Sequence, residues 1–218
     1  MDQLVFQFPF AKKYYEQDFF VSSNNFSAYK LVEGWPIWPG KWLNIFGDSG
    51  SGKTHLSKIL EKKIKNIRLI EAKNINDKIV NNLGALDCLI IDNFKNNIDE
   101  KLLYSILNQS KQSENYVLIN SINPINNNQF KIRDLKSRIN SFLSIGIELP
   151  TDELLKVIIS KTLSDKQISI NPKISDFIIN NVDRSYDKML KFLKDVDQMS
   201  LSTGKSININ LIKKVLDR

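Results

Sequence analysis

Eight consecutive residues of this chain have the types and spacing of a phosphate-binding loop. They are Gly47, Asp48, Ser49, Gly50, Ser51, Gly52, Lys53 and Thr54, which fit the pattern G-x-x-x-x-G-K-[ST] at every fixed position. The glycines allow the backbone to curl so that its N–H groups surround an anion. The lysine is expected to reach the phosphates, and the threonine hydroxyl to bind the accompanying Mg²⁺. The loop therefore predicts a nucleotide site.

A carboxylate suited to the same metal ion follows further along the chain. The run 86–93 predicts a buried strand that ends at Asp92, and such a Walker B strand would bring this acid to the magnesium ion beside Thr54. The next residue is Asn93, where many ATPases carry a second acid that activates water. Asparagine can orient a water molecule but cannot accept its proton, so we expect slow autonomous hydrolysis.

A polar residue at the end of a third strand is a candidate sensor of the γ-phosphate. The apolar run 116–119 leads directly into Asn120 and Ser121, of which Asn120 is the candidate catalytic residue. The alternative is that both residues only begin a loop, because loops after strands are commonly polar.

The elements that must position these residues alternate between strands and helices. Expected strands are 42–46, 67–72, 86–93, 116–119 and 143–149, and expected helices are 25–34, 55–60, 74–83 and 98–113. This order predicts an α/β fold with a parallel sheet flanked by helices. After Pro150 the pattern is helical only, at 152–163, 172–181, 186–201 and 210–216, which predicts a small all-helical second domain.

Composition limits the class of protein. The formal charge of +7 on 218 residues permits contact with nucleic acid, yet basicity of this size also occurs for solubility alone. The lysines 58, 62, 63 and 65 are accordingly interpreted as a solvated face rather than a binding patch. A single cysteine, Cys88, argues against disulfides and structural zinc. The chain contains no apolar stretch of membrane-spanning length and no signal-peptide layout, so we expect a cytoplasmic protein with no membrane contact.

Taken in this order, the motifs resemble those of the AAA+ ATPases. A narrower similarity is to Hda-type relatives of the replication initiator DnaA, carried by residues 19–24, 52–56, 91–93 and 135–138. The resemblance implies a tail at 1–16, an AAA+ nucleotide-binding domain at 17–149 and a helical lid domain at 150–218. It also implies that the nucleotide is ADP or ATP. Whereas DnaA continues into a helix-turn-helix domain, this chain stops after the lid.

The same resemblance assigns roles to two arginines. Arg138 corresponds to an arginine finger that enters a neighbour's nucleotide site, and Arg184 to a lid arginine that contacts bound nucleotide. A guanidinium beside the γ-phosphate stabilises charge that spreads onto its oxygens during transfer. His55 is a further candidate nucleotide contact, but packing against the loop is the favoured interpretation. Each arginine could instead form an ordinary ion pair.

The apolar N-terminal tail has two interpretations. It could pack on its own domain, or Gln3, Leu4 and Phe6 could dock in a partner's apolar pocket. The resemblance favours docking, because Hda-type proteins engage the ring-shaped DNA sliding clamp with a similar peptide. Phe6 departs from that peptide, which more commonly has leucine.

The leading hypothesis from the sequence is a regulator of replication initiation. It would bind adenine nucleotide, dock on the sliding clamp and promote ATP hydrolysis by DnaA. An alternative is an autonomous AAA+ ATPase that binds single-stranded DNA or loads a helicase. A third is a small-molecule kinase, for which the chain offers no evident acceptor-binding base. The oligomeric state and direct DNA contact are left open.

Overall fold

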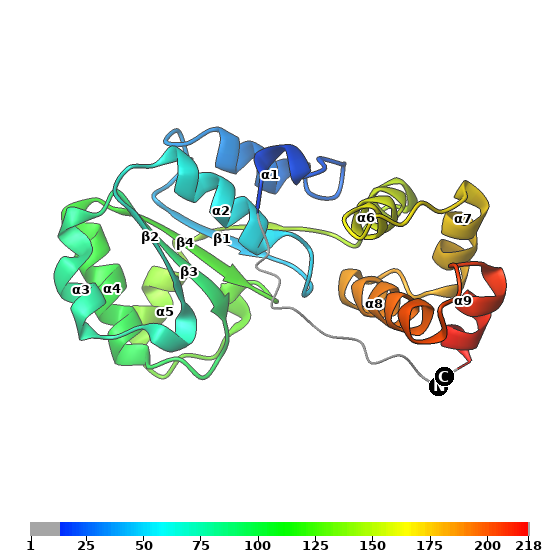
Figure 1. Cartoon of the computed structure of the whole chain (residues 1–218). Helices are drawn as coiled ribbons and strands as arrows, with labels where there is room; N and C mark the ends of the chain where they lie inside the picture. The colour runs from blue at the N-terminus through cyan, green and yellow to red at the C-terminus, as the bar shows by residue number, and fades with distance from the viewer. Residues whose placement is uncertain (1–13, 218) are drawn as a thin grey trace. The chain divides into compact units, whose positions relative to one another are not determined.

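The computed structural model describes residues 14–217, which divide into two compact units. An α/β unit is formed by residues 14–48 and 52–148, and a helical unit mainly by residues 149–217. Figure 1 shows the strands and the helices α1 to α5 of the first unit, and α6 to α9 of the second. Each unit is described by itself below.

Five parallel strands form the sheet of the α/β unit in the order β2-β3-β4-β1-β5. The strands are β1 (Trp42–Phe46), β2 (Ile67–Glu71), β3 (Cys88–Phe94), β4 (Tyr116–Ser121) and β5 (Leu143–Gly146). The central strands β3, β4 and β1 are almost entirely buried, as expected for a parallel sheet covered on both faces. The predicted fold class is confirmed.

Helices cover both faces of this sheet. They are α1 (Phe26–Glu33), α2 (Lys53–Lys63), α3 (Asp77–Asn82), α4 (Glu100–Ser113) and α5 (Arg133–Ile139). Alternate strand residues enter two separate apolar cores: Leu89 and Ile91 pack with α3, α4 and α5, whereas Cys88 and Ile90 pack with α1 and α2. Figure 1 shows α3, α4 and α5 on one side of the strands. Packing of helices on both faces of the sheet holds the carboxyl ends of the strands in place, and the phosphate loop begins at one of these ends.

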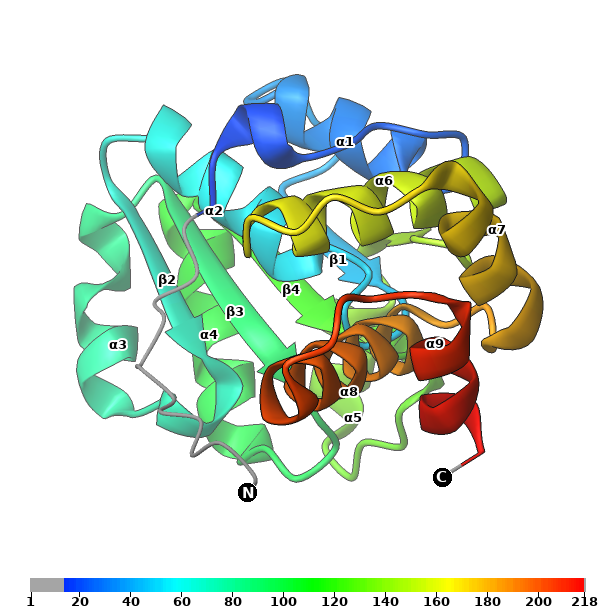
Figure 2. The same ribbon diagram turned by 45° about the vertical axis from the view of Figure 1, so that its right-hand side comes forward.

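The helical unit is built from four amphipathic segments around one apolar core. These are α6 (Asp152–Ser164), α7 (Pro172–Asn181), α8 (Tyr186–Thr203) and α9 (Ile209–Leu216). Asn171 caps α7 by accepting a hydrogen bond from the backbone N–H of Lys173, with Pro172 at the first helical position as predicted. Figure 2 shows α6 to α9 in yellow to red. Within residues 14–217, none of the helices has the length and apolar character that crossing a membrane requires.

Two predicted strands need correction, and one helix was not predicted. Strand β3 does not stop at Asp92 but continues to Phe94, with an irregularity in its pairing to β4 between Ile91 and Phe94. Strand β5 is shorter than predicted and ends at Gly146. Residues 133–139, for which the sequence analysis gave no element, form the short helix α5, because Leu135 and Ile139 are buried in the core beneath it.

Candidate functional site

The phosphate loop joins β1 to α2 through a left-handed backbone. Gly50 and Gly52 have φ of 80° and 99°, a region that side-chain-bearing residues rarely adopt. A Cβ at Gly52 would also lie 2.9 Å from Cε2 of Phe19. The loop is tied to the neighbouring strand β4, since the N–H of Gly47 donates to the carbonyls of Ser121 and Ile122 at 3.2 and 3.1 Å.

Lys53 is directed back into the loop that precedes it. Its ammonium donates hydrogen bonds to the carbonyl oxygens of Gly47 at 2.7 Å and Asp48 at 2.8 Å. Burial lowers the pKa of Lys53, although the carboxylates of Asp92 and Asp48 act in the opposite direction. A partly desolvated cation at this place is suited to bind phosphate oxygens.

A buried polar network connects the loop helix to β3 and β4. The hydroxyl of Thr54 donates to Oδ2 of Asp92 at 2.7 Å. The other carboxylate oxygen accepts from Nδ2 of Asn120 at 2.9 Å, and the same amide group donates to Oγ of Ser57 at 2.7 Å. The structure thus brings together Thr54, Asp92 and Asn120 from three different elements.

These groups fit a magnesium ion that arrives with phosphates. Mg²⁺ is usually held by one or two protein oxygens together with phosphate oxygens and water, and Asp92 and Thr54 supply two such oxygens side by side. Oδ1 of Asn120 is buried and, within residues 14–217, has no hydrogen-bond partner. An unpaired acceptor beside the carboxylate is what a hydrated cation would satisfy.

Asn93 adopts the left-handed conformation, with φ of 55°. Its N–H donates to Oδ1 of Asp92 at 3.0 Å, and its side-chain amide donates to Oε1 of Glu71 at 3.3 Å. Asparagine tolerates this backbone region better than most residues do. Asn93 is exposed near the carboxyl end of β3, with the carboxylate of Glu71 from β2 beside it.

Asn44 is a site-supporting residue that the sequence analysis missed. Its side chain is fully buried and donates to the carbonyl of Ile119 at 2.9 Å and to Oγ of Ser121 at 2.8 Å. Its Oδ1 accepts from the N–H of Ile125 at 2.9 Å. A polar residue within the apolar strand 42–46 was the available signal, because a buried amide must find partners.

His55 packs against the first residues of the α/β unit. Its Nε2 lies 2.7 Å from the carbonyl oxygen of Tyr15, and its ring makes edge contacts with Tyr14 and Phe19. On the same helix, Lys62 donates to the carbonyl of Tyr14 at 2.6 Å, and Lys63 pairs with Glu33. These two lysines of α2 therefore contact other residues of their own unit.

Arg138 lies half-buried on α5 and contacts α4. Its Nη2 donates to Oδ1 of Asn108 at 2.6 Å, and its guanidinium carbon lies 5.3 Å from the ring centroid of Tyr104. Its Nε is buried and has no hydrogen-bond partner among the described residues. Neither α4 partner was predicted, because the contact joins residues 30 positions apart.

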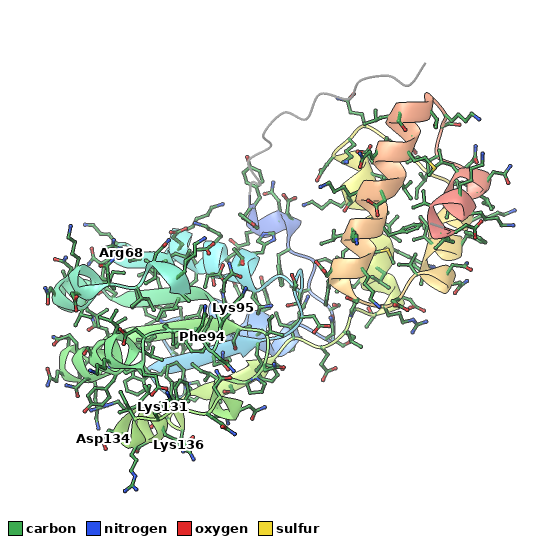
Figure 3. The ribbon with its side chains drawn as sticks, turned by 90° about the horizontal axis from the view of Figure 1, so that it is seen from below. Arg68, Phe94, Lys95, Lys131, Asp134 and Lys136 are labelled. Atoms are coloured by element: carbon green, nitrogen blue, oxygen red, sulfur yellow. The ribbon has the colours of Figure 1, made fainter. Side chains whose placement is uncertain are left out.

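The remaining candidates lie apart from this network. Arg184 belongs to the helical unit, where it forms an exposed ion pair with Asp152 at 3.1 Å. Gln3, Leu4 and Phe6 lie outside the described residues. Exposed side chains of α5 and its preceding loop include Lys131, Asp134 and Lys136, which are labelled in Figure 3.

Sequence comparisons identify DnaA and Hda as relatives. Residues 152–216 match the family model described as Hda, lid domain. DnaA of Buchnera aphidicola subsp. Cinara cedri is 28% identical over 95% of this chain and 53% of that protein. DnaA of Chlorobaculum tepidum is 27% identical over 64% of the chain and 33% of its own length. The chain thus spans about half the length of the first of these relatives and about a third of the second.

Solved structures share the fold at low sequence identity. Domain III of DnaA from Thermotoga maritima has a TM-score of 0.75 at 18% identity, covering 96% of this chain and 98% of that one. RuvB from the same organism has a TM-score of 0.60 at 18% identity, covering 81% of this chain and 61% of that chain. The predictions of an AAA+ fold and of kinship with Hda-type relatives of DnaA are confirmed.

Proposed function

We propose that this chain, an AAA+ protein related to DnaA and Hda, regulates chromosomal replication initiation by promoting ATP hydrolysis on DnaA. In this proposal it binds adenine nucleotide, engages the DNA sliding clamp and supplies an arginine to the nucleotide site of DnaA. The observation that carries the proposal is the match of residues 152–216 to the Hda lid domain. We expect it to act in the cytoplasm, where the chromosome is replicated.

Nucleotide binding is assigned to the phosphate loop and its buried network. The loop residues 47–54 would surround the phosphates, and Lys53 would bind their oxygens. Thr54 and Asp92 would hold Mg²⁺, which neutralises phosphate charge when bound. Asn120 would orient groups at the γ-phosphate end, while Arg184 and His55 are further candidate contacts. Nucleotide binding is supported by a solved structure of AMPPCP-bound DnaA, which matches this chain with a TM-score of 0.68.

Arg138 is the group that would act on the partner. A guanidinium offered in trans can raise hydrolysis by several orders of magnitude, because it stabilises the charge that develops on the transferred phosphoryl group. Its position on the surface helix α5 and its partial exposure support this role. At the chain's own site, Asn93 beside Asp92 favours slow hydrolysis, which suits a protein that acts on a partner's ATP.

The clamp contact is assigned to Gln3, Leu4 and Phe6. An apolar peptide at a chain terminus can enter a pocket on a partner without rearranging the folded domain. Calorimetric titration of the clamp with the full chain and with a Gln3→Ala, Leu4→Ala, Phe6→Ala variant tests this step. Equal binding by both proteins would remove the tail from the proposal.

The regulator function itself is tested by following labelled ATP that has been bound to DnaA beforehand. Addition of the chain with ADP and DNA-loaded clamp is expected to accelerate conversion to ADP on DnaA. The label identifies whose ATP is consumed, because it is bound to DnaA beforehand and the chain is added with unlabelled ADP. No acceleration by the wild-type chain would contradict the proposal.

Autonomous ATP hydrolysis on single-stranded DNA is the second candidate function. The contact of Asn93 with Glu71 favours it, because a carboxylate beside a water-orienting amide could accept a proton. A DnaA structure with TM-score 0.68 to this chain contains AMPPCP and single-stranded DNA, which also supports it. Hydrolysis stimulated by DNA alone and abolished by Glu71→Gln would favour this function.

A further inference from the structure

Three side chains of α4 lie on one face of that helix and contact α5 and its preceding loop. They are Glu100, Tyr104 and Asn108, spaced four residues apart. Residues at this spacing lie above one another along an α-helix. Two of them contact Arg138 itself and the third contacts the residues before α5, and we name the three together the α4 stripe.

Asn108 and Tyr104 contact the Arg138 guanidinium itself. Oδ1 of Asn108 accepts from Nη2 at 2.6 Å, and the ring of Tyr104 lies 5.3 Å from the guanidinium carbon. A hydrogen bond and a ring contact together limit rotation of a side chain that otherwise has many rotamers. Within residues 14–217, Asn108 is the hydrogen-bond acceptor of this guanidinium.

Glu100 fixes the start of the helix that carries Arg138. Its carboxylate accepts from the N–H of Lys131 at 2.9 Å and from the N–H of Ile132 at 3.0 Å. Ile132 is the N-cap residue of α5 and offers no side-chain cap. A carboxylate from α4 therefore satisfies backbone donors at this end of α5, where negative charge is also favourable.

Space remains beside the guanidinium. Arg138 lines an open hollow of about 380 Å³ together with Trp42, Tyr104, Lys111, Asp134, Ser137 and Ser141. Asn108 accepts from one nitrogen, whereas a guanidinium has five N–H donors. The stripe can therefore hold Arg138 in one orientation without using all of its donors.

We infer that the α4 stripe positions Arg138 for its action on the partner nucleotide, with Asn108 as the residue that fixes the guanidinium. This inference rests on the proposed function, because it concerns the arginine assigned to the partner's site. A preorganised donor loses less freedom when it meets the developing charge, so positioning raises the rate of hydrolysis without adding a contact to the partner.

The first test needs no partner. Relaxation of the Nε–H group of Arg138 by nitrogen NMR reports how rigidly the side chain is held, in the wild type and in Asn108→Ala. We expect the order parameter to fall in Asn108→Ala and to be recovered in Asn108→Asp, which restores an acceptor. Gln112→Ala, an exposed change on the same helix, is the matched control and should leave it unchanged. An unchanged order parameter in Asn108→Ala would overturn the inference.

The second test follows hydrolysis on DnaA. For Asn108→Ala we expect the maximal acceleration to fall about tenfold while the half-saturating concentration of the chain stays the same. Asn108→Asp should recover it, and Asn108→Ala added to Arg138→Ala should have no further effect. Faster hydrolysis with Asn108→Ala would overturn the inference, because Asn108 would then restrain Arg138. If the wild-type chain gives no acceleration, the proposed function fails, and the NMR result alone decides whether Asn108 fixes Arg138.

Discussion

The Thr54 hydroxyl and the Asp92 carboxylate lie 2.7 Å apart and join the loop helix α2 to the central strand β3. Asp92 also accepts hydrogen bonds from the backbone of Asn93 and the side chain of Asn120. Three donors around one buried carboxylate keep it oriented. The two candidate Mg²⁺ ligands, Thr54 and Asp92, are therefore held in place by contacts within the protein.

Replacement of Asp92 by asparagine should separate metal binding from phosphate binding. The amide is nearly isosteric and can keep hydrogen bonds to Thr54, but it lacks the charge that Mg²⁺ requires. We expect the affinity for ADP with Mg²⁺ to fall about 10- to 100-fold. In EDTA, the wild type and the variant should bind ADP equally. Calorimetry under both conditions measures the two affinities. If the variant lost as much affinity for ADP in EDTA as with Mg²⁺, Asp92 would not act by binding the metal ion.

The lowered pKa of Lys53 predicts weaker nucleotide binding at alkaline pH. The free protein gives up the Lys53 proton at a lower pH than an ordinary lysine does, because burial disfavours the charge. Phosphates favour the charged form, so binding should take up a proton once the pH rises into the range of this pKa. Affinity should then decrease as the pH increases further.

Titrations of ADP between pH 7 and 10, in two buffers that differ in ionisation enthalpy, measure both the affinity and the proton uptake. Affinity that stays constant or increases over this range would contradict the assignment of Lys53 to the phosphates.

Gly52→Ala should destabilise the α/β unit even without nucleotide. The substitution introduces a side chain at φ of 99° and places its Cβ 2.9 Å from the Phe19 ring. We expect a loss of about 2 kcal/mol in the free energy of unfolding, measured by urea denaturation. Gly40→Ala is the control, because a Cβ at Gly40 has no neighbour within 4 Å and should change stability little.

The contribution of the Phe19 contact can be isolated from backbone strain. When Phe19→Leu is combined with Gly52→Ala, the loss should be smaller than the sum of the two single losses, because the overlap is relieved. Additive losses would show that Phe19 does not crowd Gly52.

Asn120→Asp should make stability depend on pH. The new carboxylate would lie within hydrogen-bond distance of Asp92, since Asn120 now donates to it at 2.9 Å. Two adjacent carboxylates resist ionising together, so the folded state would have a raised carboxyl pKa. A carboxyl group whose pKa is higher in the folded than in the unfolded state lowers the free energy of unfolding at pH 7. This loss decreases as the pH falls toward the pKa of an ordinary carboxyl group.

Urea denaturation at pH 7 and pH 5 measures the effect, which we expect to reach about 1–3 kcal/mol at pH 7. Asn120→Ala is the control, since it removes the same hydrogen bonds without adding a charge. Equal pH dependence in the two variants would contradict close contact between positions 120 and 92.

The fold and the metal side of the site could be predicted because their signals are local. Glycines and Lys53 have fixed spacing within eight residues, and the strands read as short runs rich in apolar residues. Helix α5 gave no such signal, because its seven residues are held by burial of Leu135 and Ile139 and by Glu100 of α4. The contact of Arg138 with Asn108 joins residues far apart in sequence, and no periodicity predicts it.

The most direct test of the proposed function is hydrolysis of labelled ATP on DnaA in the presence of the full chain, ADP and DNA-loaded clamp. Arg133, an exposed arginine at the start of α5, provides a matched control. The wild type and Arg133→Ala should accelerate hydrolysis equally, whereas Arg138→Ala should lose about a hundredfold or more of the acceleration and still bind the clamp. Acceleration by Arg138→Ala equal to that of the wild type would contradict the account.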